Sequence, residues 1–178
     1  LNNFEKAEEL FRRALSMFPC TSASAEDLSD LYHEQRQFKQ AIAYSRLAMY
    51  LTHVHDIRCR IFMKIGESLR ELGDWSSLLN NCQRLRAFLK PRPRGISPGD
   101  AKYAEGAALA GRRRAHYELG YGFLVGGNED VAIKHFSSAI ELYFYDEAFH
   151  CFYQRSKAYF NQERWDEVIN DCKDLIDG

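Results

Sequence analysis

The sequence lacks an excess of charge of either sign and lacks any long apolar run. It has 24 Lys and Arg residues against 25 Asp and Glu residues, for a formal net charge of −1. A nucleic-acid-binding domain usually carries a basic excess, and a membrane-surface protein is attracted to anionic lipid by the same excess. No run of about 18 apolar residues occurs, as a transmembrane helix would require. We therefore expect no nucleic-acid partner and no membrane insertion.

Paired cysteines and catalytic signatures are also lacking. No two of the cysteines form a CxxC pair, and an odd number of scattered thiols is typical of a reducing compartment. The cysteines are Cys20, Cys59, Cys82, Cys151 and Cys172. We therefore expect a cytoplasmic protein, with the nucleus as the alternative. No Gly-rich phosphate loop, Ser/His/Asp order or Cys/His signature is recognisable. The sequence thus predicts neither an enzyme nor a cofactor.

The chain opens at Leu1 without an initiator Met, a basic n-region or an apolar signal segment. We expect it to be a segment of a longer protein. What it does contain is apolar surface, since 46% of its 178 residues are hydrophobic and 13% are aromatic. That length and composition fit one domain with a sizeable core, or one stretch of a longer solenoid.

The strongest positive signal is a repeat with a period close to 34 residues. The segment Phe4-Glu5-Lys6-Ala7 recurs 34 residues later as Phe38-Lys39-Gln40-Ala41, and further copies begin at Trp75, Glu129 and Trp165. Each copy has the pattern of two amphipathic helices around a short polar turn. The pattern predicts an all-α protein built from antiparallel helix hairpins.

The second copy shows the helical faces most clearly. Leu28, Leu31 and Tyr32 mark one face of its first helix at i, i+3 and i+4 spacing, and the polar residues 35–37 form the turn. The second helix is lined by small and apolar residues: Ala41, Ile42, Ser45, Ala48 and Met49. Small residues allow two helices to approach closely, and Gly66 and Gly120 take the corresponding place in the third and fourth copies.

These residues resemble the tetratricopeptide repeat. The resemblance rests on a pattern of small and aromatic residues at fixed spacings, carried in the first and fourth copies by Ala7, Ala14, Pro19, Leu119, Gly120, Phe123, Ala132, Phe136 and Ala139. Glu129 departs from the pattern where an aromatic is expected, which predicts a loosely plugged hairpin there. The resemblance implies a right-handed superhelical solenoid that acts as a non-catalytic scaffold or adaptor and holds a partner peptide or helix in its concave groove. The alternative fold is an unrelated helical bundle.

One region falls out of step with the repeat. Prolines and glycines are dense between Lys90 and Asp100, and they cannot continue a helix. A Ser97 cap followed by Pro98 then predicts that a long helix begins there. We expect a sub-stack over 1–90 with a truncated first hairpin, a Pro-rich loop over 91–96, and a second sub-stack over 97–178 with an extended first helix.

Two polar clusters have ordinary structural explanations. His53, His55, Asp56 and Cys59 include potential zinc ligands, but they fall in a turn where polar residues are ordinary and no further ligand completes a tetrahedral set. We expect no metal site. The basic run 112–114 points in directions about 100° apart on a helix, so a solvated face is expected, with an acidic partner or a phosphate as the alternative.

The resemblance also raises a second function, that of a chaperone co-factor with a carboxylate clamp. Such a clamp uses Lys and Asn side chains to bind the Glu-Glu-Val-Asp tails of heat-shock chaperones. Tyr117 and Tyr121 stand where Lys and Asn would be needed, and Gln154 replaces the second Asn. The first helices of the second and third copies instead line a charged, mixed groove: Glu26, Asp30, His33, Arg60, Met63, Glu67 and Arg70.

Within that charged groove, Arg60 and Lys64 fall at the two basic clamp positions of a third repeat. Asp27, however, stands where the clamp has Asn. We therefore expect chaperone tails to bind poorly.

The late groove is predicted to be aromatic and to bind the partner. In a tetratricopeptide stack the first helix of each hairpin lines the inner surface, which the resemblance places on one stripe of the fourth and fifth copies. We name this set the aromatic face: Tyr117, Tyr121, Tyr153 and Phe160, with Arg114 and Lys157 at its edge. Aromatic anchors are typical of interfaces. Alternatively, Tyr117 and Tyr121 pack on a neighbouring helix, or the repeats form a structural scaffold that self-associates through its truncated ends.

Overall fold

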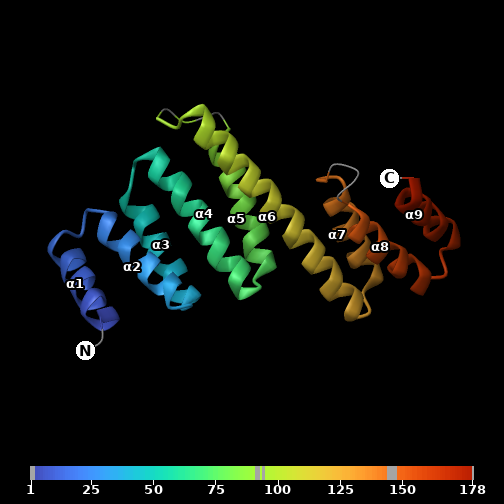
Figure 1. The fold of residues 1–178 in the computed structure, drawn as a ribbon, viewed down its shortest axis with the longest axis horizontal. Coiled ribbons are helices and arrows are strands. Elements are labelled where there is room, and N and C mark those ends of the chain that lie inside the picture. Colours follow the sequence, from blue (N-terminus) through green and yellow to red (C-terminus); the bar gives the residue numbers. More distant parts are fainter. Residues whose placement is uncertain (1–2, 91–92, 94, 144–147, 178) are drawn as a thin grey trace. The chain divides into compact units, whose positions relative to one another are not determined.

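The computed structural model describes residues 3–90, 93, 95–143 and 148–177, and the regular structure within these ranges is helical, without a strand. This confirms the predicted all-α class. The helices follow one another in chain order (Figure 1): α1 (Asn3–Met17), α2 (Ala23–Glu34), α3 (Phe38–Leu51), α4 (His55–Leu72), α5 (Trp75–Phe88), α6 (Pro98–Val125), α7 (Glu129–Ile140), α8 (Phe149–Asn161) and α9 (Trp165–Asp177).

The chain divides into two compact units, residues 1–108 and 109–178, and the division falls within α6. Residues 98–108 of this helix belong to the first unit and residues 109–125 to the second. The division into sub-stacks at the Pro-rich loop 91–96 stays a prediction, and residues 91, 92 and 94 of that loop lie outside the described residues.

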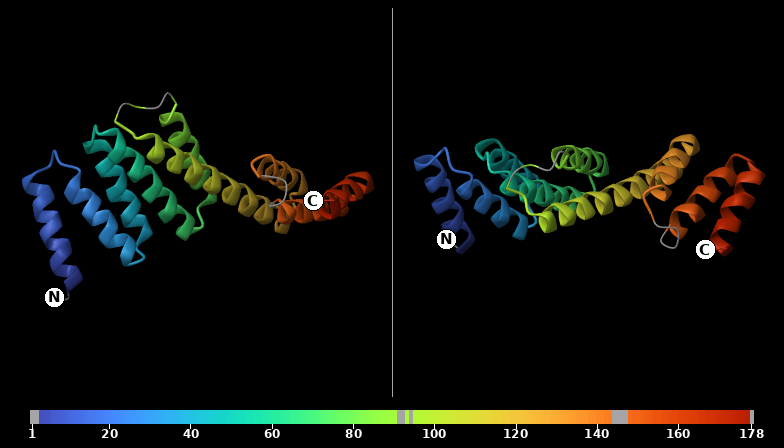
Figure 2. Two further views of the ribbon diagram at one scale, coloured as in Figure 1. Left: turned by 45° about the horizontal axis from the view of Figure 1, so that its top comes forward. Right: turned by 90° about the horizontal axis from the view of Figure 1, so that it is seen from above.

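The first unit is a series of helices in which each packs against the next. Figure 2 shows α1 to α5 side by side in chain order. Helices α2 and α3 form the second repeat, with the predicted turn at residues 35–37 between them, and α4 and α5 form the third. Leu28, Tyr32 and Ala41 form a buried cluster in the second hairpin, and Phe4 of α1 packs against it. The predicted hairpin architecture is therefore present.

The predicted core face of α3 is also confirmed. Ala41, Ile42, Ser45 and Ala48 are buried, whereas Met49 is half-buried. Small residues bring α2 and α3 close enough for polar contacts between them.

The polar contacts start from Ser29. Its hydroxyl donates to the Ala41 carbonyl at 3.0 Å and lies 2.7 Å from the Ser45 hydroxyl. Buried serines at this interface are therefore hydrogen-bonded rather than costly.

All four turns between paired helices end the first helix in the same way. A residue with positive φ follows each first helix, and the next backbone N–H donates to the carbonyl five residues earlier, at N···O distances of 3.0, 2.9, 2.8 and 3.0 Å. The positive-φ residues are Gly73 (70°), Gly127 (71°), Arg36 (57°) and Glu163 (59°). This is the Schellman arrangement, in which glycine is favoured because it has no Cβ.

The predicted start of the long α6 helix is confirmed. The helix begins at Pro98, and the Ser97 hydroxyl accepts a hydrogen bond from the Asp100 backbone N–H at 3.1 Å. The same hydroxyl donates to the Asp100 carboxylate. Ser97 thus caps the first turn of the helix, with proline placed where its missing N–H costs nothing.

In the second unit, α6 and α7 approach each other closely at Gly120. A Cβ built there would lie 2.8–3.0 Å from atoms of the Phe136 ring, which is fully buried. The third copy is less crowded, since a Cβ at Gly66 would meet its nearest neighbour at 3.4 Å. The fourth copy therefore depends on glycine more strongly than the third.

An internal ion pair joins the last three helices. Arg155 of α8 donates to both carboxylate oxygens of Asp171 of α9, at 3.0 and 2.6 Å, and to the Ser137 hydroxyl of α7 at 2.9 Å. Both charged side chains are largely removed from solvent. Breaking one side of such a pair leaves a buried charge, so the pair specifies how these helices meet.

None of the helices in the described ranges combines the length and the apolar composition that crossing a bilayer requires.

Candidate functional site

The residues of the aromatic face come from two helices of the second unit. They lie on α6 and α8, the first helices of the fourth and fifth hairpins, at spacings that keep each set on one side of its helix. On α6 they are Arg114, Tyr117 and Tyr121, and on α8 they are Tyr153, Lys157 and Phe160.

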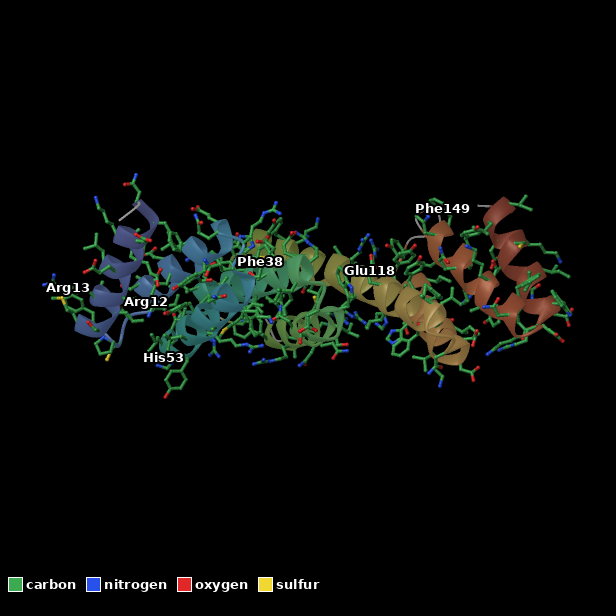
Figure 3. The ribbon with its side chains drawn as sticks, turned by 90° about the horizontal axis from the view of Figure 1, so that it is seen from below. Arg12, Arg13, Phe38, His53, Glu118 and Phe149 are labelled. Atoms are coloured by element: carbon green, nitrogen blue, oxygen red, sulfur yellow. The ribbon has the colours of Figure 1, made fainter. Side chains whose placement is uncertain are left out.

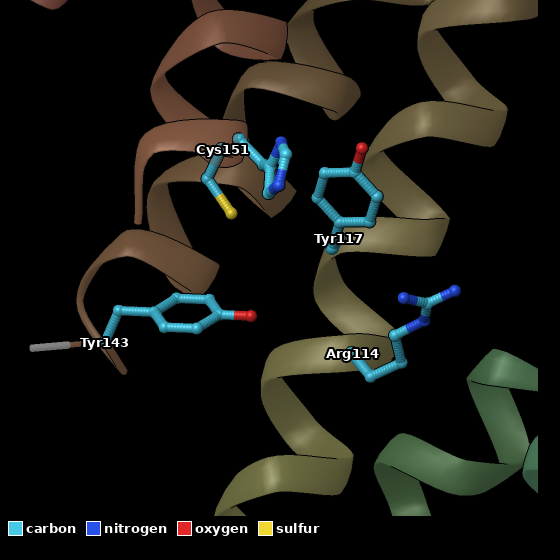
Figure 4. Close-up of a pocket in the computed structure, with 5 residues that line it drawn as sticks. Arg114, Tyr117, Tyr143 and Cys151 are labelled. Atoms are coloured by element: carbon cyan, nitrogen blue, oxygen red, sulfur yellow. The ribbon is translucent and has the colours of Figure 1, made fainter. Parts of the chain in front are cut away.

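A small pocket lies between α6, α8 and Tyr143, which follows the end of α7. Its volume is about 190 Å³, and Figure 4 shows the Tyr143 side chain directed toward α6. The pocket is lined by Arg114, Tyr117, Tyr143, His150 and Cys151. The structure thus brings together two of the predicted site residues, and it adds three that the sequence did not single out.

The two tyrosines of α6 differ in their surroundings. Tyr117 is half-buried, and its ring packs edge-on against Phe136 at a centroid distance of 6.1 Å. It therefore serves the core of the hairpin as well as the pocket. Tyr121, one turn later, is 47% exposed. Packing on a neighbouring helix, the alternative considered for both tyrosines, is therefore observed for Tyr117. The Tyr121 side chain instead faces solvent.

Tyr143 is positioned by the middle residue of the basic run. The Arg113 Nε donates to the Leu142 carbonyl at 2.6 Å, and its guanidinium carbon lies 4.7 Å from the centre of the Tyr143 ring. This stacking fixes the ring by a cation–π contact. The expectation that the basic run is only a solvated face was therefore wrong for Arg113, because Leu142 and Tyr143 contact its side chain.

Helix α8 carries a row of exposed aromatic side chains. The Lys157 ammonium lies 4.4 Å from the centre of the Tyr153 ring. Phe160 meets the Trp165 ring edge-on at 5.2 Å. Phe149, one turn before Tyr153, extends the row at the start of the helix (Figure 3) and is 51% exposed. The sequence analysis missed Phe149, although its spacing of four residues from Tyr153 was a usable signal.

The one thiol among the described residues that line the pocket is not an activated nucleophile. Cys151 is buried, and burial raises the pKa of its thiol to about 11, although the nearby Arg155 acts in the opposite direction. The thiol is therefore neutral at physiological pH, and a neutral thiol is a poor nucleophile. Arg114 forms an ion pair with Glu118 on the same helix.

The basic residues at the predicted clamp positions form ion pairs within the first unit. The Lys64 ammonium donates to both carboxylate oxygens of Asp30, at 2.6 and 2.7 Å. Arg60 lies 3.6 Å from the carboxylate of Asp56. Both basic residues at the clamp positions are therefore paired with acidic side chains of the same unit, which weakens their attraction for a free carboxylate.

The histidine-rich turn before α4 makes structural contacts. The His55 ring stacks on Phe88 at 5.8 Å. Cys59 is buried, and burial raises its pKa, with Asp56 adding to the shift. Within the part of the chain that the structure describes, no three His, Cys, Asp or Glu side chains are placed to hold a metal ion.

Comparison with solved structures finds similar folds. A TPR repeats protein from Bacteroides fragilis is 12% identical and has a TM-score of 0.57, covering 98% of this chain and 80% of its own. YrrB, a TPR protein with an unusual peptide-binding site, is 18% identical, with a TM-score of 0.51 and coverage of 99% and 78%. MamA is 15% identical, with a TM-score of 0.51 and coverage of 98% and 88%.

No protein-family model matches the sequence, and no curated protein sequence matches it either. At identities of 12–18%, the structural likeness is a likeness of fold alone.

Proposed function

We propose that this protein is an interaction scaffold that binds a partner peptide or helix through the aromatic face. Its fold is of the tetratricopeptide type, as the repeat pattern predicted. Repeat proteins commonly use the extended surfaces of such a fold for binding. The proposal is non-catalytic, in keeping with a pocket whose thiol is neutral.

The observation that carries this proposal is the exposure of large aromatic side chains on α6 and α8. Tyr121, Tyr153 and Phe160 are 47%, 49% and 57% exposed, and Phe149 adds a fourth such side chain. Aromatic residues dominate the binding energy of interfaces because they bury a large area with few rotatable bonds. Their concentration on two helices of the second unit favours a binding role over a role in the core.

Charge at the edge of the aromatic face indicates the chemistry of the partner. Lys157 lies over Tyr153, and Arg114 is exposed on α6. Cationic side chains beside apolar anchors favour a partner segment that is apolar or aromatic with an acidic flank, since complementary charge guides association. The peptide-binding site described for YrrB supports a peptide as the partner.

A second candidate function is self-association. Helix α9 exposes Trp165, Ile169 and Ile176, and α1 exposes Leu10 and Met17. Apolar side chains of this size on both helices favour a scaffold that assembles with its own copies. The chaperone clamp is the least favoured candidate, because Lys64 and Arg60 already have acidic partners.

An affinity capture experiment tests the proposal. The immobilised chain and a Tyr121→Ala/Tyr153→Ala variant are exposed to the same cell extract, with a Glu26→Ala/Asp30→Ala variant as the control from the charged groove. We expect a protein retained by the wild type and by the control and lost from the tyrosine variant, while far-UV circular dichroism stays unchanged. Loss with the control variant alone would move the binding site to the first unit and contradict the proposal.

A further inference from the structure

Acidic residues are distributed unevenly over the helices of the first unit. With 25 acidic residues in 178, two helices of 14 residues each would be expected to hold about four, yet α3 and α5 hold none. Helix α2, in contrast, has no Lys or Arg and carries Glu26, Asp27, Asp30 and Glu34. The balanced net charge of the whole chain therefore hides a separation of charge within this unit.

The two helices without acidic residues carry exposed basic side chains, which we name the basic face: Lys39 and Arg46 on α3, Arg84 and Arg86 on α5, and Lys90 just after α5. Both helices pack against α4. The right panel of Figure 2 shows α3 and α5 on one side of the first unit, with α2 and α4 on the other. The basic face thus belongs to the layer that the second helices of the hairpins form.

The charges of the basic face have no acidic partner in the described part of the chain. None of its five residues forms an ion pair with a described side chain, unlike Arg12 with Glu8 and Lys64 with Asp30 in the same unit. The Arg84 guanidinium lies 5.8 Å from the centre of the Phe62 ring, a contact that orients the side chain and leaves its charge in place.

We propose that the basic face binds an acidic segment of a second protein, distinct from the partner of the aromatic face. On α3, Lys39 and Arg46 lie in one row with Ala43 and Tyr50, at spacings that keep these side chains on one side of the helix. Tyr50 is 82% exposed, and Tyr and Arg are enriched at protein interfaces. The segment therefore carries Asp or Glu residues and an apolar side chain that packs on Tyr50.

The acidic helix beside the basic face favours a peptide over a long polyanion. Helix α2 packs directly against α3, and packed helices lie about 8–10 Å apart. This separation is close to the Debye length of about 8–10 Å at physiological salt. A nucleic acid or an anionic membrane extends over both helices and is repelled by the carboxylates of α2, whereas a peptide can follow α3 and α5 alone.

Peptide selection with counter-selection tests this inference on the full chain. Phage that display random peptides are first depleted on the variant Lys39→Gln/Arg46→Gln/Arg86→Gln and are then selected on the wild type. Glutamine removes the charges and is a good helix former, and all three positions are exposed. The recovered peptides are synthesised with amidated ends, and their dissociation constants are measured by fluorescence anisotropy.

The matched control is Lys102→Gln/Lys134→Gln/Lys173→Gln, which removes the same charge from exposed lysines of α6, α7 and α9. We expect peptides rich in Asp and Glu. Their dissociation constants should rise about tenfold in the basic-face variant, which corresponds to about 1.4 kcal/mol, and stay unchanged in the control. Tyr50→Ala should weaken binding severalfold, because it removes an aromatic anchor.

Equal losses in the two charge variants would mean general attraction of an anion and would overturn the inference. No recovered peptide, or peptides without an acidic preference, would overturn it as well. A short single strand of deoxythymidine or an anionic phosphatidylserine vesicle serves as the competing probe. If either binds more tightly than the peptides and is lost in the basic-face variant, the surface recognises phosphate groups and the assignment of a protein partner is wrong.

One further variant separates this inference from the proposed function. The recovered peptides should bind Tyr121→Ala/Tyr153→Ala as tightly as the wild type, because those tyrosines lie on α6 and α8. Loss of binding there would mean that the peptides occupy the aromatic face. That result would overturn the basic face as a binding surface and leave the proposed function standing.

Discussion

Gly120 shows how a single missing methyl group allows two helices to pack. A Cβ at this position would lie within 3.0 Å of the Phe136 ring, whose burial leaves it no room to move away. Gly122 is the natural comparison, because it lies in the same helix and a Cβ there meets nothing within 4 Å.

Alanine at these two glycines should therefore have opposite effects. Gly120→Ala should lower the free energy of unfolding by about 1–3 kcal/mol, as overpacking does in other cores. Gly122→Ala should raise it by about 0.5–1 kcal/mol, because alanine is the better helix former. Urea denaturation followed by circular dichroism measures both, and equal effects would contradict the packing argument.

A pair of histidines links α6 to α7 near the same place. The Nδ1 atoms of His116 and His135 are 3.1 Å apart, so one ring donates and the other accepts. Phe123 stacks on the His135 ring at 5.6 Å. Burial lowers the pKa of both rings, and for His116 it reaches about 4, with His135 and Arg112 adding to the effect.

This pair predicts that the second unit is weakened by acid. The pKa of His116 in the folded protein lies below its value of about 6.5 in the unfolded chain, so the unfolded chain takes up a proton first as the pH falls. The folded state is therefore at full stability above pH 6.5 and loses stability as the pH falls toward 4. The free energy of unfolding should fall by about 1–2 kcal/mol between pH 7 and pH 5. A His116→Gln variant should lose most of this slope in urea titrations, and an unchanged slope would show that other groups cause it.

At the scale of elements, the turns between paired helices differ in which residue adopts the positive φ. Two of the turns use glycine at the positive-φ position, Gly73 and Gly127, and two use side chains with a Cβ, Arg36 and Glu163. A residue with a Cβ in this conformation costs about 1 kcal/mol relative to glycine.

Glycine at the two strained ends should stabilise the fold. Glu163→Gly should raise the free energy of unfolding by up to about 1 kcal/mol, because the strain at φ 59° disappears, while the greater freedom of the unfolded chain opposes the gain. Gly127→Ala, at φ 71°, should lower it by a similar amount. Thermal unfolding monitored at 222 nm checks both signs, and a loss of stability in Glu163→Gly would refute the strain account.

The helices and turns could be predicted from the sequence, whereas some residues of the pocket could not. The hairpins, the turn at 35–37 and the Ser97 cap follow from local patterns, because helical periodicity and capping are local properties. Tyr143 and His150 were not singled out, since they lie on either side of a connection, where no periodicity marks a shared face. Arg113 was misjudged for a related reason, as its partner at Leu142 is 29 residues away.

For the whole molecule, the position of the boundary between sub-stacks remains a prediction. Trypsin cleaves poorly before proline, which leaves Arg94 as the favoured site between Lys90 and Asp100. Limited trypsin digestion should first give fragments 1–94 and 95–178, because the proline-rich sequence cannot form helix and exposed irregular segments are cut first. First cleavage inside a hairpin would place the boundary elsewhere.

The central claim for the whole molecule is that the aromatic face binds a partner. The most direct measurement is the dissociation constant of the captured partner segment for wild type, Tyr121→Ala/Tyr153→Ala and Glu26→Ala/Asp30→Ala, determined by calorimetry. The tyrosine changes should weaken binding at least about tenfold, since aromatic anchors each contribute about 2 kcal/mol or more, with helicity unchanged. The acidic changes should have little effect. Unweakened binding in the tyrosine variant, or unfolding of that variant, would contradict the account.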